Sequence, residues 1–135
     1  MPDATIKRLD GMETFYEGMV TRARAELGVT SWGMQVFALP PRFDQYPNHH
    51  HGNGAGDPGQ EEVYIPLAGS ATLVVDDEAH VLEPGVWARV GIDQRRRLIP
   101  GDEGFRYIAL GGTPGTAFVP PGWTELGAPP PAPPE

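Results

Sequence analysis

Short apolar segments separated by glycine and proline dominate this sequence. The 135 residues include 18 glycines and 16 prolines, spread along the chain. After residue 28 the apolar residues form short runs that end at turn-forming residues, and no run shows the period of an amphipathic helix of useful length. Several strands at spacings of about 8–12 residues are typical of an all-β sandwich or barrel.

The predicted elements follow from these runs. Residues 19–28, with the sequence MVTRARAELG, are the one segment with helix-forming alanines and arginines, and Gly28 is a suitable residue to follow a helix. The predicted strands are residues 5–9, 31–41, 61–68, 71–75, 79–82, 86–90, 96–99, 105–110 and 116–121. Turns rich in glycine, proline or aspartate separate them.

Composition limits the organisation and the partners. The length suits one domain, which we expect over residues 1–127, followed by a disordered proline-rich tail over 128–135. The chain has no cysteine, and its net charge of −8 argues against a nucleic-acid partner. It contains no run of about 18 apolar residues and no apolar signal core, so we expect no membrane partner and a cytoplasmic location.

Three consecutive histidines precede a glycine-rich loop, residues 52–60, that we expect to be mobile. On a strand, His49 and His51 point to the same face and His50 to the other. Glu62 begins the apolar strand after the loop, where a bare carboxylate needs a partner. Two imidazoles and a carboxylate can hold Fe(II), Mn(II), Ni(II) or Zn(II) and leave positions open for substrate. The alternative is that these are ordinary polar residues lining a barrel mouth, and His80 is predicted to lie on the surface.

The same segment resembles the first conserved motif of the cupin superfamily, G-x5-H-x-H-x3-4-E-x6-G. His49 and His51 match its histidines, and Glu62, followed by six residues and then Gly69, matches its carboxylate and last glycine. Phe43 stands at the position of the first glycine, and ten residues instead of three or four separate His51 from the glutamate. The extra residues are the glycine-rich loop.

The second cupin motif, G-x5-P-x-G-x2-H-x3-N, is matched only at its first glycine, Gly85. Counting from Gly85 places Arg96 at the metal-binding histidine. The resemblance covers about residues 33–111, is closest to compact single-domain microbial cupins, and implies a double-stranded β-helix (jelly-roll) barrel. It also implies an isologous homodimer, for which the leading strand offers a free edge.

The resemblance leaves the role of Arg96 open. If Arg96 faces inward, as the family's histidine does, Arg95 and Arg97 face outward. An inward guanidinium needs a partner, which is either Glu62, giving a buried ion pair, or the carboxylate or phosphate of a ligand. Tyr64 lies on the same face as Glu62 and can line the cavity.

Four more side chains are interpreted from their setting. Gln35 can face the pocket. Trp32, Trp87 and Trp123 are predicted to make core or dimer contacts rather than to form a ligand site.

Two function classes follow from the resemblance and the residues. One is a metal-dependent enzyme, such as a dioxygenase or isomerase, with metal on His49, His51 and Glu62 and a small polar or anionic ligand at Arg96 and Tyr64. The other is a metal-free small-molecule binding or sensing protein in which Arg96 pairs with Glu62. A structural or partner-binding role for the acidic surface is a third possibility.

Overall fold

The computed structural model describes residues 2–43 and 59–131, and almost all of its regular structure is β-strand. The strands are β1 (Thr14–Phe15), β2 (Val20–Thr21), β3 (Gly33–Leu39), β4 (Glu61–Val75), β5 (Glu78–Leu82), β6 (Ala88–Val90) and β7 (Arg96–Gly112). One short helix, α1 (Ala23–Leu27), and two 3-10 turns, η1 (Leu9–Gly11) and η2 (Gly122–Thr124), complete the list. The predictions of an all-β fold and of one short helical turn near the N-terminus are confirmed.

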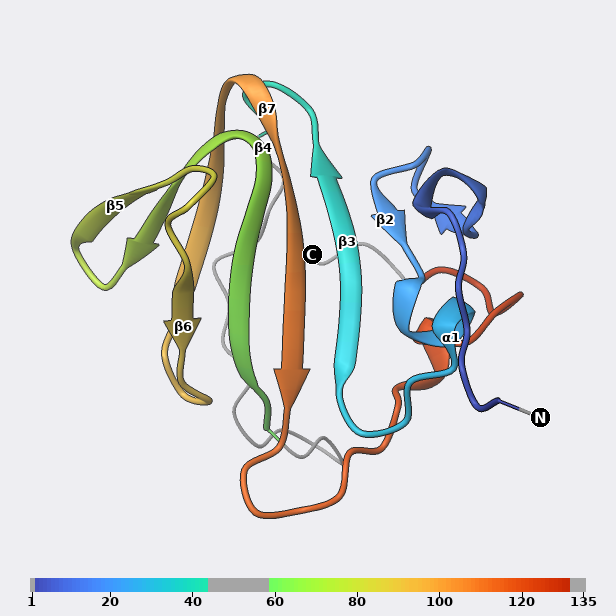
Figure 1. Cartoon of the computed structure of the whole chain (residues 1–135). Helices are drawn as coiled ribbons and strands as arrows, with labels where there is room; N and C mark the ends of the chain where they lie inside the picture. Colours follow the sequence, from blue (N-terminus) through green and yellow to red (C-terminus); the bar gives the residue numbers. More distant parts are fainter. Residues whose placement is uncertain (1, 44–58, 132–135) are drawn as a thin grey trace.

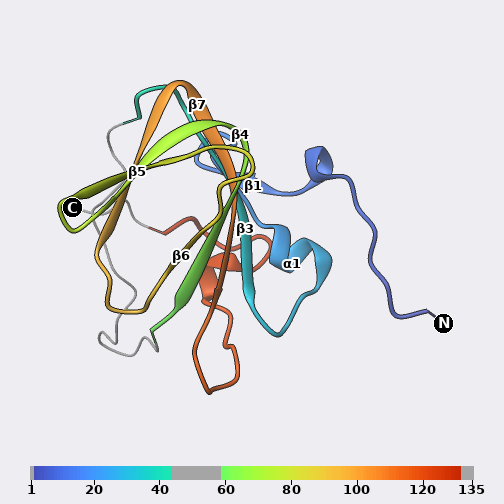
Figure 2. The same cartoon turned by 60° about the vertical axis from the view of Figure 1, so that its left-hand side comes forward.

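Two long strands organise the barrel. The sheet order is β1-β2-β3-β7-β4-β5. Strand β5 pairs with the last residues of β4, Ala71–Val75, and β6 pairs with its first residues, Glu62–Tyr64. Antiparallel pairing joins β4 to β7 in two stretches, from Glu61↔Gly112 to Gly69↔Phe105 and from Ala71↔Pro100 to Val75↔Arg96. Figure 1 shows β7 rising on the side of β5 and β6, crossing the top of the barrel and descending beside β3. Figure 2 shows the same curvature after rotation.

Six strand predictions need correction. Residues 61–68 and 71–75 are parts of one strand, β4, and residues 96–99 and 105–110 are parts of β7. Their glycine and proline residues form an irregular corner within the ladder instead of ending the strands. Residues 5–9 and 116–121 form no strand.

The corner depends on the close approach of two glycines. Gly69 and Gly104 have φ values of +73° and +77°, in the left-handed region that favours glycine. A Cβ on Gly69 would lie 2.1 Å from the carbonyl oxygen of Gly104. Because the obstacle is backbone, a side chain at Gly69 would force β4 and β7 apart where the barrel bends.

The core fills the space between the two halves of β4 and β7. Its buried side chains alternate along the strands, as a half-buried sheet requires. They are Leu39, Tyr64, Ala71, Leu73, Leu82, Val90, Leu98, Phe105, Tyr107 and Ala109. Trp32 and Trp87 are 48% and 67% exposed, so they do not belong to the core, and their predicted dimer contacts stay a prediction.

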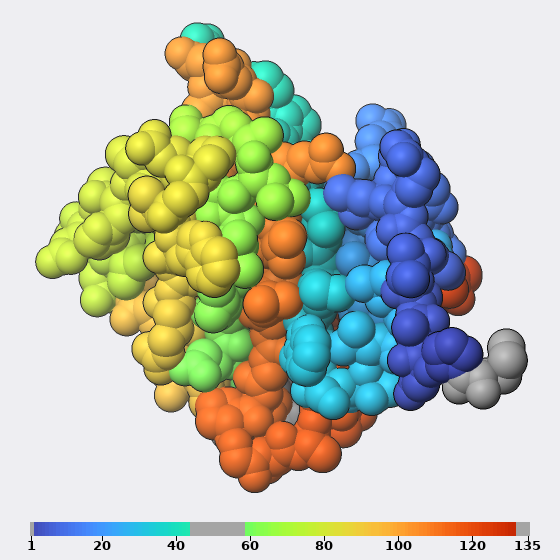
Figure 3. All heavy atoms as spheres, in the orientation of Figure 1, coloured from blue at the N-terminus to red at the C-terminus, as the bar shows by residue number. Residues whose placement is uncertain are grey.

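The N-terminal and C-terminal segments meet beside β3. Helix α1 ends at Gly28, which has φ +77° as predicted for the residue after a helix. The buried Arg22 guanidinium donates to Glu13 and, at 2.7 Å, to the carbonyl of Ala128. Arg24 donates to Glu125 at 2.8 Å. These contacts hold the C-terminal segment against the N-terminal residues, which cover one flank of the barrel (Figure 3).

The described chain continues to residue 131, where the Pro131 carbonyl accepts a hydrogen bond from Tyr16. The disordered tail stays a prediction for residues 132–135, which lie outside the described part. None of the helices in the described residues has the length and apolar character needed to cross a membrane.

Candidate functional site

A buried arginine lies inside the barrel. Arg96 is the first residue of β7 and is 0% exposed, whereas Arg95 and Arg97 are exposed. The predicted inward orientation of Arg96 is therefore correct. Its guanidinium donates from Nη2 to Glu62 Oε1, from Nε to Tyr64 Oη at 3.2 Å and from Nη1 to the Gln94 carbonyl at 2.7 Å.

Glu62 and Tyr64 complete this network from β4. They are two residues apart on a strand and share a face, and Tyr64 Oη donates to Glu62 Oε1 at 3.2 Å. The Glu62 side chain is 12% exposed. Glu61, on the opposite face, pairs with the exposed Arg89. Because neighbouring residues of a strand point to opposite faces, Glu62 forms a buried ion pair on the inner face of β4 and Glu61 forms a solvated ion pair on its outer face.

The environment keeps Arg96 charged. Burial by itself would lower the pKa of the Arg96 guanidinium, but the charge and hydrogen bonds of Tyr64 and Glu62 act in the opposite direction, and the pKa lies above its ordinary value. Arg96 is therefore a permanent cation whose donors are directed at Tyr64, Gln94 and Glu62.

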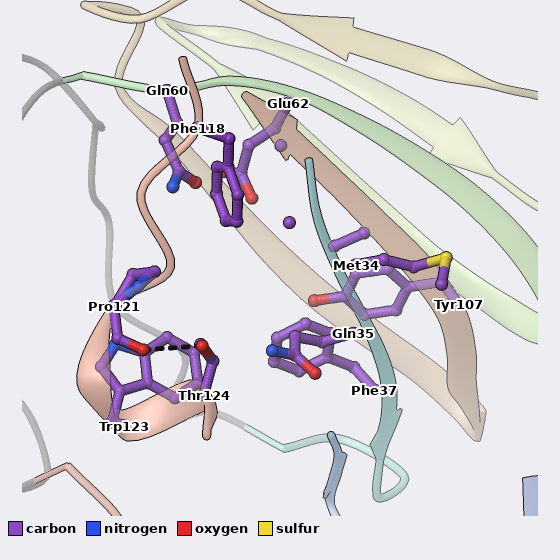
Figure 4. A pocket seen from close by; sticks show the side chains of 13 residues that line it. Met34, Gln35, Phe37, Gln60, Glu62, Tyr107, Phe118, Pro121, Trp123 and Thr124 are labelled. Carbon is purple, nitrogen blue, oxygen red and sulfur yellow. Dashed lines mark hydrogen bonds between the residues drawn. The ribbon is translucent and has the colours of Figure 1, made fainter. Parts of the chain in front are cut away.

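A cavity of about 250 Å³ opens beside this network. Its walls come from β3, β7, the start of β4 and the C-terminal segment around η2. The lining residues are Gly33, Met34, Gln35, Phe37, Gln60, Glu62, Tyr107, Ala109, Gly111, Phe118, Pro121, Trp123 and Thr124. In Figure 4 the side chains of Gln35 and Phe37 face Trp123 and Thr124 across the cavity, and Glu62 lies towards its other end. A mostly apolar cavity with a few polar groups is the usual form of a small-molecule site.

The structure places the predicted site residues in different settings. Glu62 lines the cavity, and Tyr64 and Arg96 lie behind it within the core. His49, His50 and His51, together with most of the 52–60 loop, lie outside the described residues. His80 is on the surface as predicted, 3.4 Å from Glu78.

The described residues do not suit a metal ion. Within residues 2–43 and 59–131, no three histidine or acidic side chains converge into a possible metal site. Glu62, the described member of the predicted ligand set, already accepts hydrogen bonds at Oε1 from Arg96 and Tyr64. A cation on this carboxylate would lie close to the positive guanidinium.

The sequence reasoning missed the wall formed by the C-terminal segment. Phe118 lies in the segment wrongly predicted as a strand, and Trp123 was assigned to core or dimer contacts. Trp123 lines the cavity and packs edge-to-face on Phe15 at 5.9 Å between ring centroids. The sequence does contain a signal for this wall. Two aromatic residues, Phe118 and Trp123, lie among glycine and proline turns after the last long strand. Gln35 does face the cavity, as predicted.

Comparison with known proteins identifies the fold. No family model and no curated protein matches the chain. A cupin protein from Bacteroides fragilis is similar in structure, with a TM-score of 0.64 and 17% identity over 90% of this chain and 93% of that one. The plu4264 protein from Photorhabdus luminescens has a TM-score of 0.59 and 17% identity over 84% and 90% of the two chains. KdgF from Halomonas sp. has a TM-score of 0.53 and 11% identity over 62% and 69%. The chain therefore has a cupin-type jelly-roll barrel fold.

Proposed function

We propose that this chain is a metal-free, small-molecule-binding protein whose ligand occupies the cavity beside Glu62. The observation that carries the proposal is the ion pair between Glu62 and the fully buried Arg96, at the end of a mostly apolar cavity. In this reading Arg96 replaces the metal. It fixes the Glu62 carboxylate and closes the inner end of the site.

The metal-dependent oxygenase or isomerase is the less favoured alternative. In the cupin resemblance, His49, His51 and Glu62 would hold the ion, which would act as a Lewis acid or redox centre. The residues that the structure describes do not fit that role, because Glu62 Oε1 is shared with Arg96 and Tyr64. The contacts of Glu62 therefore favour the binding function, and no catalytic step is assigned to these residues.

A thermal-shift screen of small neutral and charged molecules tests the proposal. The screen is run on the parent chain and repeated on two variants with an altered cavity. Ala109 is buried in β7 and lines the cavity, so Ala109→Phe should place a ring in the ligand volume. Phe118→Ala removes part of the opposite wall without altering the β-ladder. We expect compounds that stabilise the parent to lose their effect in both variants and to keep it in Val81→Phe, a change at an exposed position of β5. Stabilisation that persists in both cavity variants would contradict the proposed site.

A further inference from the structure

One polar group of the cavity wall lacks a partner. The side chain of Gln35 is on β3, and the residue is only 7% exposed. Within the described residues, its Oε1 atom is buried and accepts no hydrogen bond. An unpaired buried acceptor is unfavourable, so a ligand that donates to it gains a hydrogen bond that the described residues do not supply.

The surfaces around Gln35 are flat and apolar. Phe37 and Tyr107 lie beside it with nearly parallel rings, 5.1 Å apart between centroids. Phe118 and Trp123 contribute two more aromatic surfaces from the C-terminal segment (Figure 4). Aromatic walls favour a ring-shaped ligand, because stacked and edge-to-face contacts add to the burial of apolar area.

The charges of the site disfavour an anion. No lysine or arginine is among the described residues that line the cavity, and Arg96 directs its donors at Glu62, Tyr64 and Gln94. Glu62 is the one carboxylate on this described part of the wall. A ligand carboxylate or phosphate would lose its hydration and meet a like charge, with no cation on the described wall to compensate. Of the two partners that the sequence left open for Arg96, Glu62 or an anionic ligand, the structure places Glu62 next to its Nη2.

Resting on the proposed binding function, we infer that the cavity selects a neutral, planar ring compound that carries an N–H donor, of the aromatic amide type. The ring lies among Phe37, Tyr107, Phe118 and Trp123, and the N–H group donates to Gln35 Oε1. Gln35 is then the residue that determines specificity, and Glu62 excludes anionic analogues.

Three probes of nearly equal shape test this inference on the whole chain by calorimetric titration and ligand-observed NMR. Benzamide has the N–H donor, acetophenone replaces that group by methyl, and benzoate replaces it by an anionic oxygen. We expect benzamide to bind at least about tenfold more tightly than either of the others. Gln35→Met should remove this preference while ring binding persists, and Val81→Met, on the exposed edge strand, should leave it unchanged.

A second readout separates recognition from folding. Because Oε1 of Gln35 accepts no hydrogen bond from the described residues, Gln35→Met should be at least as stable as the parent towards denaturant. A marked loss of stability in Gln35→Met would show that the amide has a structural role, and it would overturn the inference.

The remaining outcomes are distinguishable. Equal binding of the three probes, abolished by Ala109→Phe, would overturn the inference and leave the binding function intact. Binding that is insensitive to Ala109→Phe would contradict the proposed site itself. Failure of all three probes to bind, or tighter binding of benzoate, would also overturn the inferred ligand class.

Discussion

Replacing Arg96 by methionine should destabilise the fold severely. Arg96 is 0% exposed, and its partner Glu62 is 12% exposed, so neither charge has much access to water. Removing one member of a buried pair leaves an uncompensated charge and typically costs about 3–5 kcal/mol. Arg96→Met also leaves the Gln94 carbonyl without the hydrogen bond that it accepts at 2.7 Å. We therefore expect a loss of about 3–5 kcal/mol in the free energy of unfolding.

The matched control is the solvated ion pair of Glu61, the residue that precedes Glu62 on β4. Arg89 pairs with Glu61 on the outer face, where the two side chains are 67% and 38% exposed. Arg89→Met should cost no more than about 1 kcal/mol, as is usual for solvated pairs. Denaturant unfolding measures both losses. The comparison is valid where the variants show the same slope of unfolding free energy against denaturant concentration (the m value) as the parent.

A double variant tests the coupling. Because Glu62→Gln removes the carboxylate charge that Arg96→Met would strand, the pair of changes should cost less than the sum of the two single changes, by at least about 1 kcal/mol. A loss below about 1 kcal/mol in Arg96→Met, equal to that of Arg89→Met, would refute the argument that the inner pair is desolvated.

Three further predictions concern the corner, acid stability and metal affinity. Gly69→Ala should cost at least about 2 kcal/mol in chemical denaturation because it combines a left-handed backbone with a backbone clash, whereas Gly112→Ala, with open space around it, should be tolerated. The pKa of Glu26 is lowered by the hydrogen bonds from the Lys7 side chain and the Glu13 N–H, so its contribution to stability is present above its ordinary pKa and is lost as pH falls through the lowered value. Glu26→Gln should therefore lose less stability than the parent between about pH 6 and pH 3, and an identical pH profile would contradict this. Arg96→His, which restores the family's ligand type, should bind Zn(II) or Ni(II) at least about tenfold more tightly than the parent by calorimetry, about 1.4 kcal/mol; equal affinity would contradict the motif alignment.

The all-β class could be predicted because its signals are local, and the jelly-roll barrel was implied by the resemblance to the cupin motifs. Alternation of apolar residues and the glycine and proline turns located most of the strands, and the resemblance to the second cupin motif, counted from Gly85, implied the inward direction of Arg96. The fusion of two predicted strands into β4, and of two more into β7, could not be predicted in this way. It depends on the approach of Gly69 to Gly104, which are far apart in sequence.

The candidate site was only partly predictable for the same reason. Glu62 and Tyr64 were found because both lie on one strand face. Whether Arg96 pairs with Glu62 or with a ligand depends on the distance between these two side chains across the barrel. The periodicity of the sequence gives no information on that distance. The contribution of Trp123 to the cavity depends on how Arg22 and Arg24 hold the C-terminal segment against the N-terminal residues.

The most direct test of a metal-free ligand site is the methyl NMR spectrum of chelator-treated protein labelled at methionine. Met34 lines the cavity, whereas Met12 and Met19 do not. We predict that benzamide shifts the Met34 methyl resonance saturably, leaves that of Met12 unchanged, and has no effect on Met34 in Ala109→Phe. A Met34 response that appears only after Zn(II), Mn(II) or Fe(II) is added back would contradict the metal-free account.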